Sequence, residues 1–424
     1  MNEDVQDDGP DPTEPAGLFD LSDPRYTANP YDTYRVARQT APVCPITGDG
    51  PWIVTGRAEA AAVLRDPVRF TSRANTLGAY EFTDACRKLL SDSVYYRVPP
   101  FNADPPEHGR FRALVDEEFS PAALHRNEPA IRATADTLVR GLKSTKDETG
   151  ADLLAGFAQP LPLAVICDII GVPPQDRDTV KAWNNDWLLM QVLPLPEEDQ
   201  LRCAKSVLEF EAYFRALLAD RSRHPADDLL GVLAAAAAQS DPVCTHDDAV
   251  AALLSLLPSA HETTSHLIAN TVHRLLRDRR LWEEVVSDPG LIPAAVEEGL
   301  RHTTSLQGTP RLVTEDTVVG GTAIPAGAKV HAMVAAVGRD PESAEDPETF
   351  RLDRTGPPRH FAFGHGPHSC LGAHLARLES RIALEALTTT LPDLELAPGF
   401  EPHHLPGGFV LHGLLTLPVT WPTS

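Results

Sequence analysis

The spacing of apolar residues along the chain predicts a protein built mostly from helices. In long stretches the apolar residues recur every three or four positions, which places them on one face of a helix. Clusters of proline and glycine, such as Gly171-Val172-Pro173-Pro174, interrupt these stretches and mark the connections between helices. We expect helices over residues 30–40, 58–66, 82–90, 122–142, 157–170, 175–192, 197–223, 227–238, 246–277 and 372–391.

Alternating apolar and polar residues, the pattern of a strand with one buried face, are confined to a few segments. They predict a strand at 52–55, several strands with turns between 309 and 334, and a hairpin over 409–421. Length alone suggests two or three domains. However, no internal repeat and no flexible linker divides the 424 residues, so we expect one large domain over residues 23–424, mainly α with a small β-rich region. Residues 1–22 are acidic and rich in proline, and we expect a disordered tail there.

The formal net charge of −23 limits the classes of partner. An acidic chain is repelled by phosphate backbones and by anionic lipid surfaces, so we expect neither nucleic acid nor a membrane as a partner. No apolar run approaches the roughly 18 residues of a transmembrane helix, and the first residues lack the pattern of a signal peptide. The six cysteines have no disulfide framework spacing, which favours a soluble protein in a reducing cytoplasm. They are Cys44, Cys86, Cys167, Cys203, Cys244 and Cys370.

Cys370 lies in the most distinctive stretch of the chain, residues 360–379. Gly364, Gly366 and Gly372 flank it, and a run of helix formers follows. The pattern predicts a tight loop that presents one thiolate at a helix N-terminus, where the helix dipole lowers a thiol pKa. Two other interpretations stay open from these residues alone. One is a buried structural cysteine, which leaves the glycines unexplained. The other is a zinc site, which no second cysteine supports. Its ligands would be His365, His368, Cys370 and His374.

A second unusual stretch, residues 259–264, lies in the middle of the expected helix 246–277. Glu262 and Thr263 interrupt a segment rich in alanine and leucine, and burying them is costly unless they have partners. Either they take part in chemistry, or Glu262 reaches a surface edge and Thr263 bonds the carbonyl four residues earlier. Pro258 lacks an N–H, and its ring crowds the carbonyl of Leu254, four residues earlier. We therefore expect a kink or opening of the helix one turn before Glu262.

Two charged pairs fall on helix faces. His108 and Arg112 lie four residues apart after a pair of prolines that suits a helix start, and Glu298 and Arg301 lie three apart. As surface neighbours, such pairs contribute a few tenths of a kcal/mol. Glu297 could compete with Glu298 for the arginine.

The order Phe363-Gly364-x-Gly366-x-His368-x-Cys370-x-Gly372 resembles the haem-binding loop of the cytochromes P-450. The other three segments agree with this resemblance in order and spacing. It implies a mainly α triangular prism in which haem b lies between the helix of Glu262 and the helix after Cys370. It also implies that Cys370 is the axial ligand of the haem iron and that Glu262 and Thr263 deliver protons to bound dioxygen. Further haem contacts fall to His108, Arg112, Ala260, Arg311, Phe363, Gly364, His368 and Gly372, and a buried structural pair to Glu298 and Arg301.

The resemblance implies an enzyme that activates O2 and hydroxylates or epoxidises a small molecule, favouring a secondary metabolite. Electrons would come from NAD(P)H through ferredoxin reductase and ferredoxin, and the protein would act as a monomer. Alternatives are a haem-thiolate enzyme of another outcome, such as ring coupling or peroxide-driven oxidation, and a non-enzymatic haem or zinc protein. Arg110, Arg126 and Arg377 would either dock the ferredoxin or be ordinary solvated arginines. The substrate pocket would include Ser255, Ser259, Leu306, Gln307, Thr309, Val410 and Leu411.

The chain departs from the family in one place. Bacterial members usually carry Ala-Gly or Gly-Gly before the acid, where this chain has Ser259-Ala260 after Pro258. Glycine permits close approach of backbone to ligand. Either Pro258 moves the helix distortion upstream and the methyl of Ala260 and the hydroxyl of Ser259 reshape the pocket, or alanine is small enough to change nothing.

Overall fold

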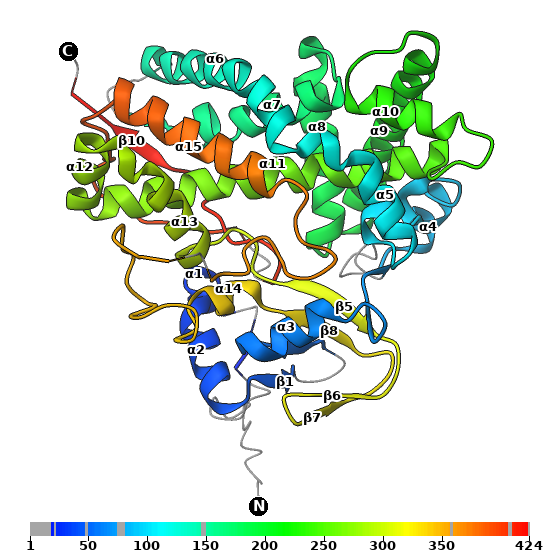
Figure 1. Cartoon of the computed structure of the whole chain (residues 1–424), viewed down its shortest axis with the longest axis horizontal. Coiled ribbons are helices and arrows are strands. Elements are labelled where there is room, and N and C mark those ends of the chain that lie inside the picture. Colours follow the sequence, from blue (N-terminus) through cyan, green and yellow to red (C-terminus); the bar gives the residue numbers. More distant parts are fainter. Residues whose placement is uncertain are drawn as a thin grey trace, which may run out of the picture.

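The computed structural model describes residues 18–20, 23–46, 50–73, 81–145, 150–356, 359–405 and 409–422. Most helices gather in the upper part of Figure 1, and the largest sheet lies below them beside the N-terminal helices. This is the mainly α fold with a small β-rich region that the sequence predicts. The helices are α1 (Pro24–Ala28), α2 (Pro30–Thr40), α3 (Arg57–Arg65), α4 (Asp84–Leu89), α5 (Glu107–Val115), α6 (Pro121–Thr145), α7 (Pro160–Ile170), α8 (Arg177–Val192), α9 (Glu197–Arg223), α10 (Leu229–Ala237), α11 (His246–Arg277), α12 (Arg279–Ser287), α13 (Ile292–His302), α14 (Val334–Gly338) and α15 (Ala373–Thr390).

The longest of these helices, α11, organises the helical part. Its first turn is closed by a capping box, in which Thr245 Oγ1 accepts from the Asp248 N–H and the Asp248 carboxylate accepts from the Thr245 N–H. Its alanines and leucines pack against α7, α9, α10, α13 and α15. The helix is therefore buried on nearly all sides, as its composition predicts. It continues through Pro258 without a break, so the expected opening is not observed.

The largest sheet has five short strands in the order β1-β2-β8-β5-β3. β2 pairs with β8 in parallel, with Trp52 opposite Val330, and the other pairs are antiparallel. One face of this sheet packs on α3 through Val63, Leu64 and neighbouring apolar residues. Its strands are β1 (Val43–Pro45), β2 (Trp52–Val54), β3 (Phe70–Thr71), β5 (Thr309–Val313) and β8 (Lys329–Ala332).

Two smaller sheets complete the fold. β6 (Thr317–Val319) and β7 (Thr322–Ile324) form a two-stranded ribbon. β10 (Pro418–Thr420) pairs with both β4 (Ala151–Asp152) and β9 (Glu395–Leu396). The prediction of a hairpin over residues 409–421 is therefore wrong, because the strand at its end pairs with two segments distant in sequence.

The start of the described chain is held by aromatic packing. The ring of Phe19 is buried and lies 6.2–6.4 Å from the rings of Tyr26, Tyr34 and Phe409. Phe19 falls within the tail that the composition led us to expect as disordered, and at this residue the expectation is wrong. The rest of residues 1–22, apart from residues 18 and 20, lies outside the described residues. No described helix is both long and apolar enough to cross a membrane.

Candidate active site

The Cys370 loop has the tight geometry that its glycines predict. Gly364 and Gly366 have φ angles of +70° and +79°, a region that favours glycine. A Cβ at Gly366 would come within 2.5 Å of the Leu64 carbonyl oxygen, so the loop also lies directly on α3. The Cys370 N–H donates to the Phe363 carbonyl at 2.8 Å, and α15 begins three residues later. The backbone thus fixes one cysteine at the start of a helix.

The thiol of Cys370 lines a pocket of about 270 Å³ together with Phe363, Gly364, Ala373 and Arg377. Cys370 is exposed, whereas the other five cysteines are buried. The protein packed around the pocket raises the pKa of the Cys370 thiol, and a hydrogen bond from the Gly372 N–H only partly offsets this. The expected lowering of this pKa by the helix N-terminus is therefore wrong for the thiol without a metal. A bound metal cation would instead lower the pKa of this thiol, because a thiol that coordinates a metal is deprotonated.

The neighbouring histidines do not converge on Cys370. The His365 ring stacks on Phe361 with centroids 4.5 Å apart, and His368 Nδ1 faces the Phe101 carbonyl at 3.2 Å. Among the described residues, no group of three or more His, Cys, Asp or Glu could hold a metal ion. The zinc interpretation therefore fails on geometry.

The predicted propionate-binding residues meet in space. His108 on α5 and His368 in the cysteine loop lie with ring centroids 4.0 Å apart, and Arg112 donates to the Ser369 carbonyl. Arg311 on β5 is only 4% exposed, and its burial lowers its pKa to about 10. It makes no ion pair with a described carboxylate and donates only to Thr309 Oγ1 and the Pro310 carbonyl.

These residues fit the acidic groups of a haem. A buried arginine without a paired carboxylate is costly, and an incoming propionate would compensate its charge. The buried Nε2 of His368 likewise has no hydrogen-bond partner among the described residues. Burial lowers the pKa of His368 to about 4, so the ring is neutral and Nε2 could donate to or accept from a haem propionate.

Glu262, on α11, is hydrogen-bonded to residues of the neighbouring helix α8. It is 5% exposed, and its Oε1 accepts from Lys181 Nζ at 2.7 Å and from Asn184 Nδ2 at 3.2 Å, both on α8. His261 Nδ1 lies 3.0 Å from the same oxygen. Burial alone would raise the pKa of Glu262, but hydrogen bonds and charges from His261 and Lys181 lower it well below its ordinary value. Glu262 is a buried carboxylate and not a surface side chain.

Thr263 makes the local hydrogen bond that a threonine in a helix can make. Its Oγ1 donates to the Ser259 carbonyl at 2.7 Å, and Ser259 Oγ donates in turn to the Ser255 carbonyl at 2.7 Å. The Thr263 carbonyl accepts from Ser305 Oγ, which ties α11 to the segment before β5. Ala260 and Thr263 are partly exposed, so both remain reachable from the space beside α11.

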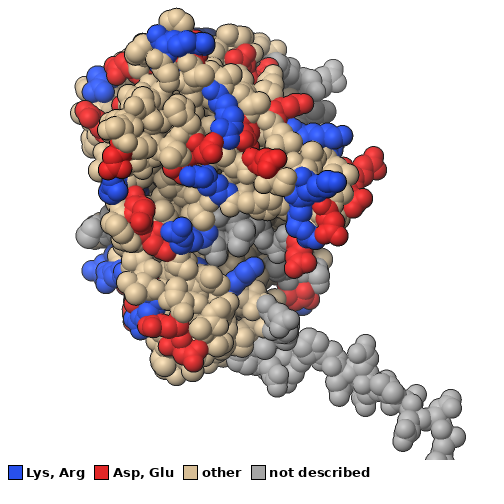
Figure 2. Space-filling view, turned by 90° about the vertical axis from the view of Figure 1, so that its right-hand side faces the viewer, with Lys and Arg blue, Asp and Glu red and all other residues tan. Residues whose placement is uncertain are grey.

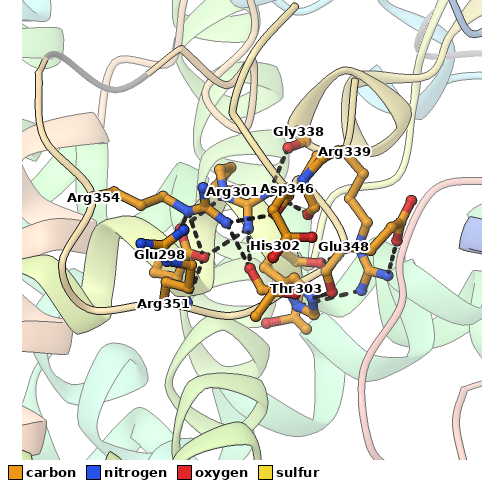
Figure 3. Close-up of polar contacts among 12 residues, drawn as sticks. Glu298, Arg301, His302, Thr303, Gly338, Arg339, Asp346, Glu348, Arg351 and Arg354 are labelled. Carbon is orange, nitrogen blue, oxygen red and sulfur yellow. Dashed lines mark hydrogen bonds and ion pairs between the residues drawn. The ribbon is translucent and has the colours of Figure 1, made fainter. Parts of the chain in front are cut away.

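The Glu298–Arg301 pair is buried, as the resemblance implies. The two side chains, 3% and 5% exposed, join through two hydrogen bonds of 2.6 and 2.7 Å. Arg354 also donates to Glu298, and Arg301 donates to the carbonyls of Gly338, Pro347 and Thr349. Figure 3 shows these contacts joining α13 to the chain after α14. Glu297 does not compete for Arg301, because it pairs with Arg377 and His360.

The three arginines expected to dock a ferredoxin differ in their surroundings. Arg110 and Arg126 are exposed and make no ion pair with a described carboxylate. Arg377 is bound internally, to Glu297 and over the ring of Phe363. Figure 2 shows basic and acidic side chains interspersed over the face that it presents.

Six of the seven expected substrate residues lie on two neighbouring segments, on α11 or at the start of β5, and the seventh is fully buried. Leu306 and Leu411 form an isolated β-bridge, and the Gln307 N–H donates to the Val410 carbonyl, so these segments lie side by side. Ser255 and Ser259 lie one turn apart on α11, and Thr309 begins β5. Gln307 is the exception. It is fully buried, and its amide is occupied by Tyr34 OH and the Thr304 carbonyl, so it is not open to a substrate.

Sequence reasoning missed three polar residues of the site, Lys181, Asn184 and Arg354. Lys181 and Asn184 share one face of α8 at a three-residue spacing, which is a weak signal. Their partner lies about 80 residues away, so only the packing of α8 on α11 identifies it.

A family model described as "Cytochrome P450" matches residues 91–399 of the chain, a range that includes His108, Glu262, Glu298 and Cys370. The chain belongs to the cytochrome P450 family. The cytochrome P450 monooxygenase PikC of Streptomyces venezuelae is 34% identical over 404 residues, covering 93% of this chain and 92% of the relative. The mycinamicin IV hydroxylase/epoxidase of Micromonospora griseorubida is 34% identical over 396 residues, covering 92% and 94%.

Solved structures agree with this membership. Cytochrome P450 CREJ in complex with (4-ethylphenyl) dihydrogen phosphate superposes with a TM-score of 0.87 at 30% identity, over 93% of this chain and 98% of that one. An intact type IV self-sufficient cytochrome P450 monooxygenase superposes with a TM-score of 0.88 at 30% identity, over 96% of this chain and 53% of that one. This cytochrome P450 is therefore an oxidoreductase whose family uses haem and O2.

Proposed function

We propose that this cytochrome P450 binds haem b through Cys370 and inserts one oxygen atom of O2 into a small molecule of secondary metabolism, as a hydroxylase or epoxidase. The proposal is carried by two observations: an exposed cysteine in a glycine-framed loop, and a buried arginine, Arg311, that makes no ion pair with a described carboxylate. One site would hold the iron and the other a propionate. No other described cysteine is exposed.

His108, Arg112, Arg311 and His368 would hold the propionates, and Ala260 and Thr263 on α11 would also line the haem site. When bound, the haem supplies the chemistry of O2 activation, and a thiolate ligand favours O–O cleavage. The chain's own part is to fix the ligand, move protons and orient the substrate. Glu262 and Thr263 would act in proton delivery, because a carboxylate takes up protons and passes them on, and Thr263 carries a partly exposed hydroxyl.

The reaction balances with external electrons. A substrate C–H bond, O2, NAD(P)H and one proton give an alcohol, water and NAD(P)⁺. We assign the electron transfer to a ferredoxin and its reductase, with the exposed Arg110 and Arg126 as docking charges for an acidic partner. The protein would act as a monomer in the cytoplasm, in keeping with its dispersed cysteines.

The substrate class rests on the relatives and on the pocket. The mycinamicin IV hydroxylase/epoxidase is a relative at 34% identity, which favours a functionalised natural product. Ser255, Ser259 and Thr309 would supply hydroxyls and Leu306, Val410 and Leu411 apolar surface, a mixed lining that would suit such a molecule.

Two experiments test the proposal in sequence. A spectral screen identifies compounds that displace water from the ferric iron. Turnover of a compound found in this way, with NADPH, ferredoxin and ferredoxin reductase under ¹⁸O2, should yield a product carrying one ¹⁸O atom. A product without ¹⁸O would favour ring coupling or another outcome. No electron consumption with any compound that binds would contradict a monooxygenase.

A further inference from the structure

Three side chains around the cysteine loop form one connected group, Glu297, His360 and Arg377, which we call the Arg377 cluster. Arg377 on α15 donates to both carboxylate oxygens of Glu297 on α13. His360, at the start of the cysteine loop, lies with Nε2 3.2 Å from Glu297 Oε2. The cluster therefore ties both ends of the loop to a third element, α13.

The hydrogen bonds define the charge of each member. The carboxylate can only accept, so His360 Nε2 carries the proton. His360 Nδ1 accepts from the Ala362 N–H at 3.3 Å, so it carries none, and the ring is neutral. Burial alone would raise the pKa of Glu297, but hydrogen bonds from His360 and Arg377 lower it to about 2. The cluster thus holds one positive and one negative charge.

The positive member of this pair faces Cys370. Arg377 lines the same 270 Å³ pocket as the Cys370 thiol, together with His360, whereas Glu297 does not line it. Its guanidinium lies 4.5 Å from the ring centroid of Phe363, which lines the same pocket. The Cys370 N–H in turn donates a hydrogen bond to the backbone carbonyl of Phe363.

We propose that the Arg377 cluster is a positioning device that sets the electrostatic field at the Cys370 sulfur, with Arg377 as the near charge and Glu297 as its neutraliser. This inference rests on haem ligation by Cys370, proposed above. One-electron reduction of the iron adds a negative charge to the thiolate-bound centre. A nearby positive charge favours that step and a nearby negative charge opposes it, most strongly where water is excluded.

The two single substitutions should therefore act in opposite directions. Glu297→Gln removes the neutraliser and should shift the midpoint potential of the haem to more positive values. Arg377→Gln leaves Glu297 unpaired and should shift it to more negative values. The double variant should return close to the wild-type potential. A role in packing alone would move both single variants the same way or not at all.

The matched control lies one turn further along α15. Arg381 pairs with Glu385, with side chains 30% and 29% exposed against 33% and 28% for Arg377 and Glu297. Arg381 does not line the cysteine pocket. Arg381→Gln and Glu385→Gln should leave the potential at the wild-type value.

Potentials are measured by titrating the purified holoprotein with dithionite, the one-electron donor, while following the haem spectrum. Opposite shifts with a restored double variant support the inference. Shifts of the same sign, or shifts no larger than those of the control pair, overturn it. Should a glutamine variant not retain haem, Arg377→Lys and Glu297→Asp keep the charges, and a potential far from wild type in these would also overturn it. A wild-type protein without a thiolate-type Soret band instead contradicts Cys370 as the ligand, before any variant is compared.

Discussion

Lys181 Nζ lies 2.7 Å from Glu262 Oε1 and so joins α8 to the central helix α11. The contact supplies a cation to a carboxylate that is only 5% exposed. It also places the side chain of Lys181 on α8 next to Glu262, the residue proposed to move protons. A change in the position of α8 would therefore change the environment of Glu262.

Substitution of Lys181 tests this contact. Lys181→Met should lower the free energy of unfolding by about 1–3 kcal/mol, because it removes a charged hydrogen bond and leaves Glu262 with His261 and Asn184 only. Urea unfolding measures the change. Lys205 on α9 is exposed and makes no ion pair with a described carboxylate, so Lys205→Met is the control. Equal stability of the two variants would show that Lys181 contributes nothing to the buried site.

Thr263 should control how electrons are used. Thr263→Ala is expected to leave substrate binding nearly unchanged and to divert electrons to hydrogen peroxide, because the hydroxyl that passes protons is lost. Thr263→Ser keeps a hydroxyl at the same atom and should stay coupled. The measurement is peroxide formed per NADPH consumed. Unchanged coupling in the alanine variant would reduce Thr263 to its hydrogen bond with the Ser259 carbonyl.

The buried pair on α13 should matter for folding and not for chemistry. Glu298→Ala leaves Arg301 and Arg354 without their carboxylate and should cost about 3–5 kcal/mol, with loss of bound haem. Thermal unfolding and haem content measure this. Glu284→Ala breaks the exposed pair with Arg280 and should cost less than about 1 kcal/mol. A wild-type melting temperature for Glu298→Ala would contradict the buried geometry.

Stability should fall in mild acid because of buried histidines. Burial lowers the pKa of His412 to about 3 and that of His266 to about 4. The ordinary value is about 6.5, so the folded state resists a proton that the unfolded state takes up. The contribution is complete above pH 6.5 and declines as pH falls, by about 2 kcal/mol for each histidine at pH 5.

Substitution of His412 isolates its share of this effect. Its ring stacks on His404 with centroids 4.2 Å apart, and burial of the ring lowers the pKa of His412. His412→Gln cannot titrate, so its free energy of unfolding should fall less steeply between pH 7 and pH 5 than that of wild type. The exposed His224 serves as the control position, as His224→Gln. Parallel pH profiles for wild type and His412→Gln would contradict the assignment.

The parts of the fold that follow from local pattern could be predicted, and those that depend on distant partners could not. α2, α9 and α11 begin and end at the predicted residues, because apolar spacing defines them locally and prolines mark the start of α2 and α9. The pairing of β10 could not be predicted, since its partner β4 lies far along the chain.

The site divides in the same way. The Cys370 loop could be predicted because its backbone geometry requires glycine at certain positions, and the glycines are visible in the sequence. Gln307 was expected to meet substrate, but Tyr34, from a helix near the N-terminus, occupies its amide. For Arg377 the sequence allowed either a docking charge or a solvated arginine, but not its contacts with Glu297 and Phe363. Periodicity contains no information on such partners.

Ligation of haem iron by Cys370 is tested most directly by the spectrum of the reduced, CO-bound protein. Wild type and Cys44→Ala, which removes a buried cysteine, should both show the Soret band typical of a thiolate ligand. Cys370→Ser should lack it, because a neutral hydroxyl does not replace a charged soft ligand. A wild-type spectrum in Cys370→Ser would contradict the assignment of the iron ligand and the function built on it.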